Sequence, residues 1–267
     1  MTARLYVNAV GFAAPGIESA EALRRHLAGA ASAPAEGWAP MPACLARRQA
    51  LRLSEATRIA LMAAEQIGAH VPRDGAWVFA SSTGEGGTLA EILTALRGDE
   101  IMIQPIRFQN AVHNAAQGQW SIIAGATGPM TSIAAYDETA GAGLLKAMLQ
   151  ATIDGTAVGL VVFDAPMPEP LLEKRPIGLP MAASLALSPA ETPGSIAALD
   201  LTVVTGTAAT PSTPPQAADS LTASGNPVRV LLPLLQRILS PDGSEITLAL
   251  PGDAALRITA MEAADAR

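Results

Sequence analysis

The chain has 267 residues, of which 49% are hydrophobic and 15% charged, and its formal net charge at pH 7 is −7. This length can bury a substantial core in one large domain or two small ones. The acidic balance, without a cluster of Lys and Arg, argues against nucleic acid as a partner, because binding to the phosphate backbone requires such clusters.

Cys44 is the only cysteine, which excludes an intramolecular disulfide and a cysteine-based metal cluster. The single cysteine is consistent with a reducing, cytoplasmic location. We also expect no metal and no cofactor. The first twelve residues lack the apolar core of a signal peptide. The uncharged run 108–136 is long enough to cross a bilayer, but its Asn, Gln, Gly and Pro content favours core and subunit interface, so we expect no membrane partner.

Before residue 165 the hydrophobic pattern alternates between strands and helices. In chain order it predicts a strand at Arg4–Val10, a helix at Ile17–Ala30, a loop at Ala30–Ala43, a helix from an N-capping Ser54 to Gly68, a strand at Trp77–Ser82, a turn at Gly84–Gly87, a helix at Thr88–Arg97, and later a helix at Glu138–Thr152 and a strand at Ala157–Phe163. Such alternation of buried strands with helices is typical of α/β folds.

Beyond residue 165 the elements are shorter and separated by Pro-rich segments. The pattern predicts strands at Ala182–Leu187 and Ala197–Val204, a mobile surface loop at Thr205–Asn226, a helix at Pro227–Leu239, and strands at Glu245–Leu250 and Ala255–Met261.

Two strings in the middle of the chain carry a family resemblance. One is Gly128-Pro129-Met-Thr-Ser-Ile133, and the other is Phe108-Gln-Asn-Ala-Val-His-Asn-Ala-Ala-Gln-Gly-Gln-Trp-Ser-Ile122. They resemble the N-terminal half of β-ketoacyl synthases, strongly over residues 77–165 and hardly after 190. The resemblance implies an α/β, thiolase-like fold with a trimmed or incomplete second half. Residues 1–165 would form the ketosynthase-like half and residues 166–267 a reduced C-terminal half with a flexible loop at 205–226, packed as one domain.

The family's reactive cysteine lies eight residues past the proline of the first string, and here that position holds Asp137. A condensing enzyme needs a thiolate that accepts and releases an acyl group, which a carboxylate cannot do. The family also uses histidines of its second half, whereas no histidine follows His113. Asp137 could instead cap the following helix, line a vestigial acyl pocket, or act as an acid or base. Cys44 is interpreted as a small buried hydrophobic residue or an inert surface thiol, and Ser132 within an apolar strand is not expected to be a nucleophile.

The resemblance also implies roles for the residues around the second string. The segment 108–122 would run along a dimer interface, with a polar network formed by Asn110, His113, Asn114, Gln117 and Trp120. The turn Ser81–Gly87 lacks the lysine of a phosphate-binding loop and would shape the far end of an acyl tunnel. Candidate tunnel or gate residues are Glu85, Leu89, Ile92, Arg107, Phe108 and Asp137.

The second string is most similar to the short chain length factors of aryl polyene clusters. This implies a non-catalytic subunit that pairs with a catalytic ketosynthase as a heterodimer, limits product length, and meets the acyl carrier protein through that partner. Two alternatives stay open. The chain could decarboxylate malonyl-carrier protein for priming, which needs oxyanion donors near the vestigial pocket, or it could form a homodimer that acts as a scaffold or binding protein.

Overall fold

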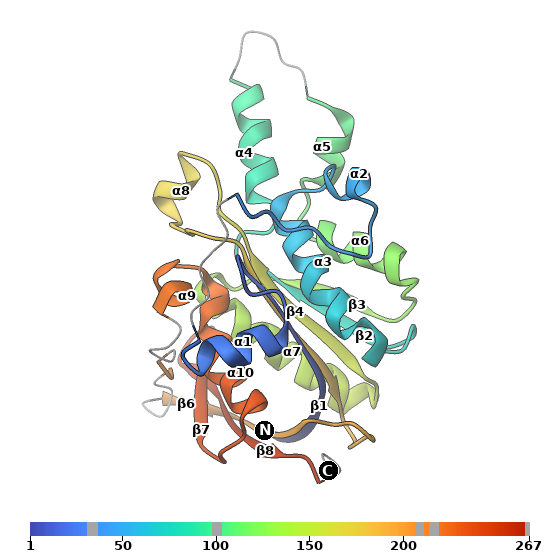
Figure 1. Cartoon of the computed structure of the whole chain (residues 1–267), viewed down its shortest axis with the longest axis vertical. Coiled ribbons are helices and arrows are strands. Elements are labelled where there is room, and N and C mark those ends of the chain that lie inside the picture. Colours follow the sequence, from blue (N-terminus) through green and yellow to red (C-terminus); the bar gives the residue numbers. More distant parts are fainter. Residues whose placement is uncertain (31–36, 98–102, 207–210, 214–218, 265–267) are drawn as a thin grey trace.

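The computed structural model describes residues 1–30, 37–97, 103–206, 211–213 and 219–264. Within these residues eight strands form one mixed sheet in the order β3-β2-β4-β5-β1-β6-β8-β7 (Figure 1). The strands are β1 (Thr2–Ala13), β2 (Ala76–Ala80), β3 (Met130–Ile133), β4 (Val158–Asp164), β5 (Met181–Ser188), β6 (Ala197–Thr205), β7 (Glu245–Leu250) and β8 (Ala254–Glu262). Strand β2 runs parallel to β3 and β4, whereas the other neighbours are antiparallel.

Helices cover both faces of this sheet, and others project from it. The described helices are α1 (Ala20–Leu27), α2 (Arg47–Ala50), α3 (Glu55–Ile67), α4 (Gly86–Ala95), α5 (Pro105–Asn110), α6 (Ala115–Ala124), α7 (Thr139–Asp154), α8 (Leu171–Lys174), α9 (Asp219–Ala223) and α10 (Leu232–Leu239), with short 3-10 turns η1 (Gly68–His70), η2 (Tyr136–Glu138) and η5 (Pro227–Leu231). Helices α3 and α6 pack on one face, and α1, α7 and α10 pack on the other. The result is a layered α/β arrangement.

The sheet separates two hydrophobic cores, one under α3 and one under α7. Successive strand residues point alternately into one core and the other, because side chains alternate between the two faces of a β-strand. In β2, Trp77 and Phe79 join the core under α3, while Val78 joins the core under α7. In β1 a register shift follows Val7, so that Val7 and Val10 face the same core although they are three residues apart. Strand β1 continues past the predicted end at Val10 because it pairs with β5 as far as Ala13.

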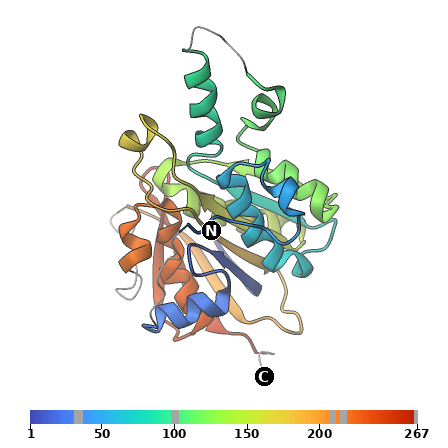
Figure 2. The ribbon, with the colours of Figure 1, turned by 45° about the horizontal axis from the view of Figure 1, so that its top comes forward.

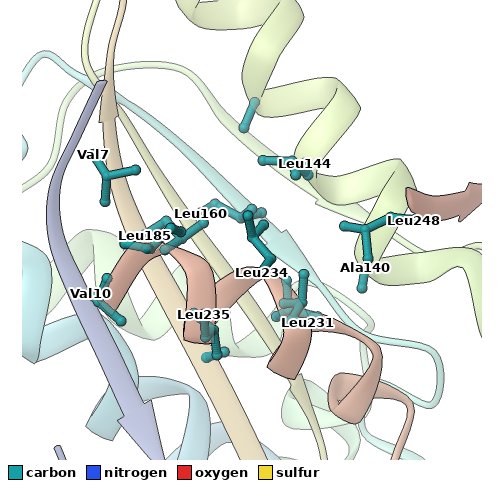
Figure 3. Close-up of a cluster of buried hydrophobic side chains, with 14 of the residues drawn as sticks. Val7, Val10, Ala140, Leu144, Leu160, Leu185, Leu231, Leu234, Leu235 and Leu248 are labelled. Carbon is teal, nitrogen blue, oxygen red and sulfur yellow. The ribbon is translucent and has the colours of Figure 1, made fainter. Parts of the chain in front are cut away.

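The sheet curls so that its last strand, β7, lies against α7. A side chain at Gly141 of α7 would collide with the backbone carbonyl of Ala249 in β7, so only glycine permits this approach. Leucine and valine side chains of the middle strands β1, β4 and β5 and of the last strand β7 meet inside the curl with side chains of α7, η5 and α10 (Figure 3). Ser212 covers the outer edge of β7, since its backbone amide donates to Thr247 O at 2.9 Å and its hydroxyl accepts from Thr247 N.

Most predicted elements are present, and two need correction. Ser54 caps α3 by accepting from Thr57 N at 2.9 Å, as predicted. The helix predicted from Ile17 begins only after Ser19, because the Ser19 hydroxyl caps it. The prediction of a mobile loop up to Asn226 is wrong for its described last part, which forms α9 and ends in a fully buried Asn226. Residues 207–210 and 214–218 of that loop, and 31–36 of the predicted loop at 30–43, lie outside the described residues.

Helices α4 and α5 form an arm that projects from the layered body (Figure 2). The string 108–122 is therefore not one continuous helix. Helix α5 ends at Asn110, a turn follows, and α6 begins at Ala115. The break places His113 in the turn between the arm and the body.

Candidate functional site

A polar turn after β2, residues 81–84, lies at the centre of the region in which the sequence analysis predicts a functional site. The carboxylate of Asp164, at the end of β4, is fully buried there. It accepts from Ser81 Oγ at 2.8 Å, from Thr83 N at 2.9 Å and from Thr83 Oγ1 at 2.8 Å. Because a buried carboxylate is stable only when its oxygens are bonded, Asp164 fixes the shape of this turn.

Glu85, a predicted tunnel residue, is also buried, and both of its carboxylate oxygens accept hydrogen bonds. Its Oε1 accepts from Ser54 Oγ at 2.8 Å and from Thr57 Oγ1 at 2.6 Å, and its Oε2 accepts from Thr88 Oγ1 at 3.0 Å. The side chain thus ties the start of α4 to the start of α3. This geometry makes Glu85 a structural anchor for the arm, and its carboxylate points away from solvent.

The predicted interface residues do not bond to one another within the described chain. His113 Nε2 lies 3.0 Å from Ser81 O, so the imidazole holds the polar turn as an N–H donor. Gln117 Oε1 accepts from Ser132 Oγ at 2.5 Å and joins α6 to β3. Asn110 lines a groove beside the arm, and Asn114 is exposed at the start of α6 without a capping bond from its side chain.

Trp120 lies in the core of the chain itself, which argues against the predicted interface role. Its side chain is 4% exposed and its ring stands edge-on to Trp77, with 5.0 Å between the ring centroids. Its indole Nε1 is buried without a partner among the described residues. A side chain in this position stabilises the α6 layer and offers almost no surface to another subunit.

Asp137, at the position where the sequence resemblance places a nucleophile, lies in η2 just before α7. Tyr136 has a φ of 50°, in the left-handed region that a tyrosine rarely adopts. Asp137 does not cap α7, because the N-cap residue is Glu138, whose side chain makes no capping bond. Thr139 Oγ1 instead accepts from Ala135 N at 2.9 Å and donates to Tyr136 O, which fixes the turn before the helix. The Asp137 side chain is 64% exposed and pairs instead with Arg175 Nη1 at 2.5 Å.

Arg175 was not singled out from the sequence, although it is the cation nearest this position. It comes from the segment between β4 and β5, thirty-eight residues further along the chain. Its guanidinium carbon lies 3.9 Å from the centroid of the Tyr136 ring, and its Nη2 donates to Ser82 Oγ at 3.3 Å. No local pattern could reveal it, because it lies in a Pro-rich stretch that only the fold brings over η2.

The remaining tunnel candidates lie on the arm. Ile92 is buried, whereas the side chains of Leu89 and Phe108 are 45% and 69% exposed. Arg107 forms an ion pair with Glu91 that joins α5 to α4. Between the arm and the start of α3 runs a groove of about 990 Å³, lined by Leu51, Arg52, Leu53, Ser54, Glu55, Arg58, Gly87, Thr88, Glu91, Gln104, Ile106, Arg107 and Asn110.

An unpaired sheet edge and exposed apolar side chains lie beside the string 108–122. Strand β3 is the first strand of the sheet, and none of the described strands pairs with its other side. On α6 the side chain of Ile122 is 77% exposed, and Val112 before this helix is 48% exposed. Such an edge with apolar neighbours is typical of surfaces that other chains cover.

Other candidate groups have no arrangement that suggests catalysis. Burial, assisted by the nearby Glu65 carboxylate, raises the pKa of the Cys44 thiol to about 12, so this thiol stays protonated at neutral pH. Within the described ranges no three His, Cys, Asp or Glu side chains are placed to hold a metal ion. The same ranges contain no helix that is both long and apolar enough to span a bilayer.

The comparison with protein families decides the assignment. The family model described as beta-ketoacyl synthase, N-terminal domain, matches residues 21–244. The chain belongs to this family. No curated protein sequence matches the chain at a significant level.

Solved structures of ketosynthases have the same fold. The chain superposes on a chain of the ketosynthase ApeO in complex with its chain length factor ApeC from Xenorhabdus doucetiae, with a TM-score of 0.72, 21% identity, and coverage of 96% of this chain and 98% of that one. A chain of AntDE:AntF, a type II PKS acyl-carrier protein in complex with its ketosynthase, gives a TM-score of 0.69 at 11% identity, covering 98% and 100%. A beta-ketoacyl synthase from Burkholderia phymatum gives 0.57 at 12% identity, covering 85% and 71%.

These similarities confirm the predicted fold class, an α/β, thiolase-like ketosynthase fold that is trimmed relative to a longer ketosynthase. The described residues after 190 add β6, β8 and β7 to the single sheet. The short turn η2 lies at the surface of this fold. Tyr136 and Asp137, in η2, are both exposed to solvent, at 60% and 64%.

Proposed function

We propose that this protein is the non-catalytic chain-length-factor subunit of a type II, aryl polyene-like ketosynthase. The single observation that carries the proposal is Asp137 at the position of the reactive cysteine, exposed and paired with Arg175. A carboxylate has no sulfur and cannot hold an acyl group as a thioester, with or without an ion pair. The only thiol of the chain, Cys44, is held protonated by its burial. Condensation then has to take place on another polypeptide.

The surface proposed to meet that polypeptide is formed by β3, α6 and the end of α5. A free strand edge can pair with the matching edge of a second chain of the same fold, and the apolar side chains of Phe108 and Ile122 would be covered at the same time. A pseudo-symmetric heterodimer with a catalytic ketosynthase follows from this arrangement. The acyl carrier protein would reach the complex through the ketosynthase, and a second copy of this chain could use the same surface when the ketosynthase is absent.

The arm is proposed to limit the length of the product. Leu89 and Phe108 expose apolar side chains on it, and the pair between Glu91 and Arg107 fixes α5 against α4. Placed at the end of the partner's acyl tunnel, these side chains would stop the growing chain. Glu85 keeps the arm in place through its three hydroxyl contacts.

Co-expression with the ketosynthase of the same gene cluster tests the proposal. We expect a stable 1:1 complex by native mass spectrometry, and longer products when Phe108 is replaced by Ala. Leu171→Ala in α8, outside the proposed contact, serves as the control and should leave product length unchanged. A ketosynthase that is soluble and fully active without this chain would refute the proposal, as would recovery of this chain only as a homodimer in the presence of the ketosynthase.

A further inference from the structure

Arg175 has more hydrogen-bonding capacity than the chain uses. Its side chain is only 15% exposed, and its guanidinium stacks on Tyr136 and bonds to Ser82 and Asp137. A guanidinium has five N–H donors in a planar fork, and two of these on adjacent nitrogens match the two oxygens of a carboxylate. Asp137 uses Nη1 alone, whereas the buried Nε has no partner among the described residues. The guanidinium of Arg175 is therefore held in one position, while part of its hydrogen-bonding capacity is unused.

The elements that hold the fork are themselves rigid. Ser82 belongs to the polar turn that Asp164 binds, and its backbone amide donates to Asp164 Oδ2 at 3.2 Å. Tyr136 is held by the bond from Thr139 Oγ1 to its carbonyl oxygen at 2.7 Å. A cation stacked on a ring within about 6 Å of its centroid gains electrostatic stabilisation, which keeps the guanidinium over Tyr136. The arginine is thus positioned independently of Asp137.

We infer that Arg175 forms a carboxylate-binding site whose resident ligand is the chain's own Asp137. The Asp137 carboxylate occupies the position at Nη1 that a free carboxylate ligand would take, so another carboxylate can bind there only when Asp137 is absent. This assigns Asp137 a role different from those of a helix cap and of an acid or base. It also explains why an acidic residue suits this position, since an apolar residue here would leave a largely buried guanidinium without its anion.

The inference predicts a ligand site that appears when Asp137 is removed. In Asp137→Ala the guanidinium would lack its only acidic partner among the described residues, and a small carboxylate such as acetate or malonate can take the vacated place. One charge-assisted hydrogen bond corresponds to roughly tenfold or more in affinity. We therefore expect acetate to bind Asp137→Ala at least about tenfold more tightly than it binds the unaltered chain.

Acetate and malonate titrations followed by NMR of the arginine Nε–H signals test this site. Binding should shift the Arg175 signal in Asp137→Ala, and neither the unaltered chain nor Asp137→Ala/Arg175→Ala should bind comparably. Acetamide, which is neutral but similar in shape, should not bind. Glu138→Ala is the matched control, because it removes the adjacent carboxylate, which has no ion pair with Arg175.

Two outcomes would overturn the inference. One is a folded Asp137→Ala protein that binds acetate no more tightly than the unaltered chain, and the other is equal binding after Arg175 is also removed. If Asp137→Ala does not fold, Asp137→Ser provides the same readout, because its side chain is polar but uncharged and smaller than that of aspartate. The inference does not rest on pairing with a ketosynthase, so its failure would leave the proposed function untouched.

Discussion

Replacing Trp120 by Ala should destabilise the chain by itself, before any partner is present. The indole is 4% exposed, packs edge-on against Trp77, and contacts the end of α3 at Gly68, where an added Cβ would lie 3.1 Å from the ring. Removing a buried tryptophan costs about 3–5 kcal/mol of unfolding free energy, of which the aromatic pair contributes about 0.5–1.5 kcal/mol. For a urea dependence of about 1–3 kcal/mol per molar, the midpoint should fall by roughly 1–5 M.

The control is Trp120→Phe, which keeps an aromatic ring in the same place. It removes the indole N–H that has no partner in the described part of the chain. Because leaving such a group buried costs about 1–3 kcal/mol, its removal offsets much of the lost packing. We expect Trp120→Phe to unfold within about 1 kcal/mol of the unaltered chain.

Equilibrium unfolding in urea, followed by circular dichroism on the isolated chain, measures both variants. The reasoning would be refuted if Trp120→Ala unfolded at the same urea concentration as the unaltered chain and yet failed to bind a ketosynthase. That result would support the prediction from the sequence that Trp120 lies in a subunit interface.

Four further predictions concern separate parts of the chain. Ile122→Glu should leave the stability of the isolated chain within about 0.5 kcal/mol but weaken the complex with a ketosynthase, whereas Ile153→Glu, on α7 and 74% exposed, should leave the complex intact; loss of the complex in both variants would refute the interface. A disulfide reagent at pH 8 should modify Cys44 on the order of 10³-fold more slowly in the folded chain than in urea, because its pKa is raised to about 12; equal rates would contradict its burial. Arg4 bonds to Asp200 and lowers the pKa of that carboxyl. The pair therefore stabilises the fold at neutral pH, and this stabilisation is lost as the pH falls from the usual aspartate pKa near 3.9 through the lowered pKa. Acid unfolding of Asp200→Asn should show a shallower pH dependence in that window, and an unchanged pH dependence would contradict the ion pair. Incubation of the chain with malonyl-carrier protein should release no carbon dioxide by mass spectrometry, and release would favour the decarboxylase alternative.

Elements with a strong local pattern could be predicted from the sequence. Helix α3 has a capping serine and apolar residues at helical spacing, and β4 is a continuous apolar run, so both were found with bounds close to those observed. The bulge after Val7 and the curl that brings β7 to Gly141 depend on contacts between distant segments. They have no local signal, so the extent of β1 and the closing of the sheet could not be predicted.

The candidate site was predicted only in part, for a similar reason. Position 137 could be located from its distance to Pro129, but the partner of Asp137 comes from a distant Pro-rich segment. Trp120 lies in a string of polar residues, and its neighbours in sequence do not tell which side of α6 faces the core. Asn226 belongs to a tract whose composition is typical of loops, although its side chain is buried and bonds to the carbonyl oxygens of Asp164 and Leu179.

Intact-protein mass spectrometry of the co-expressed complex, after incubation with acyl- and malonyl-carrier proteins, tests the central proposal most directly. Both subunits are measured in the same sample, so each acts as the control for the other. We predict an acyl adduct on the cysteine of the ketosynthase and an unchanged mass for this chain. An acyl group covalently attached to this chain, released by hydroxylamine as a thioester would be, would contradict the account.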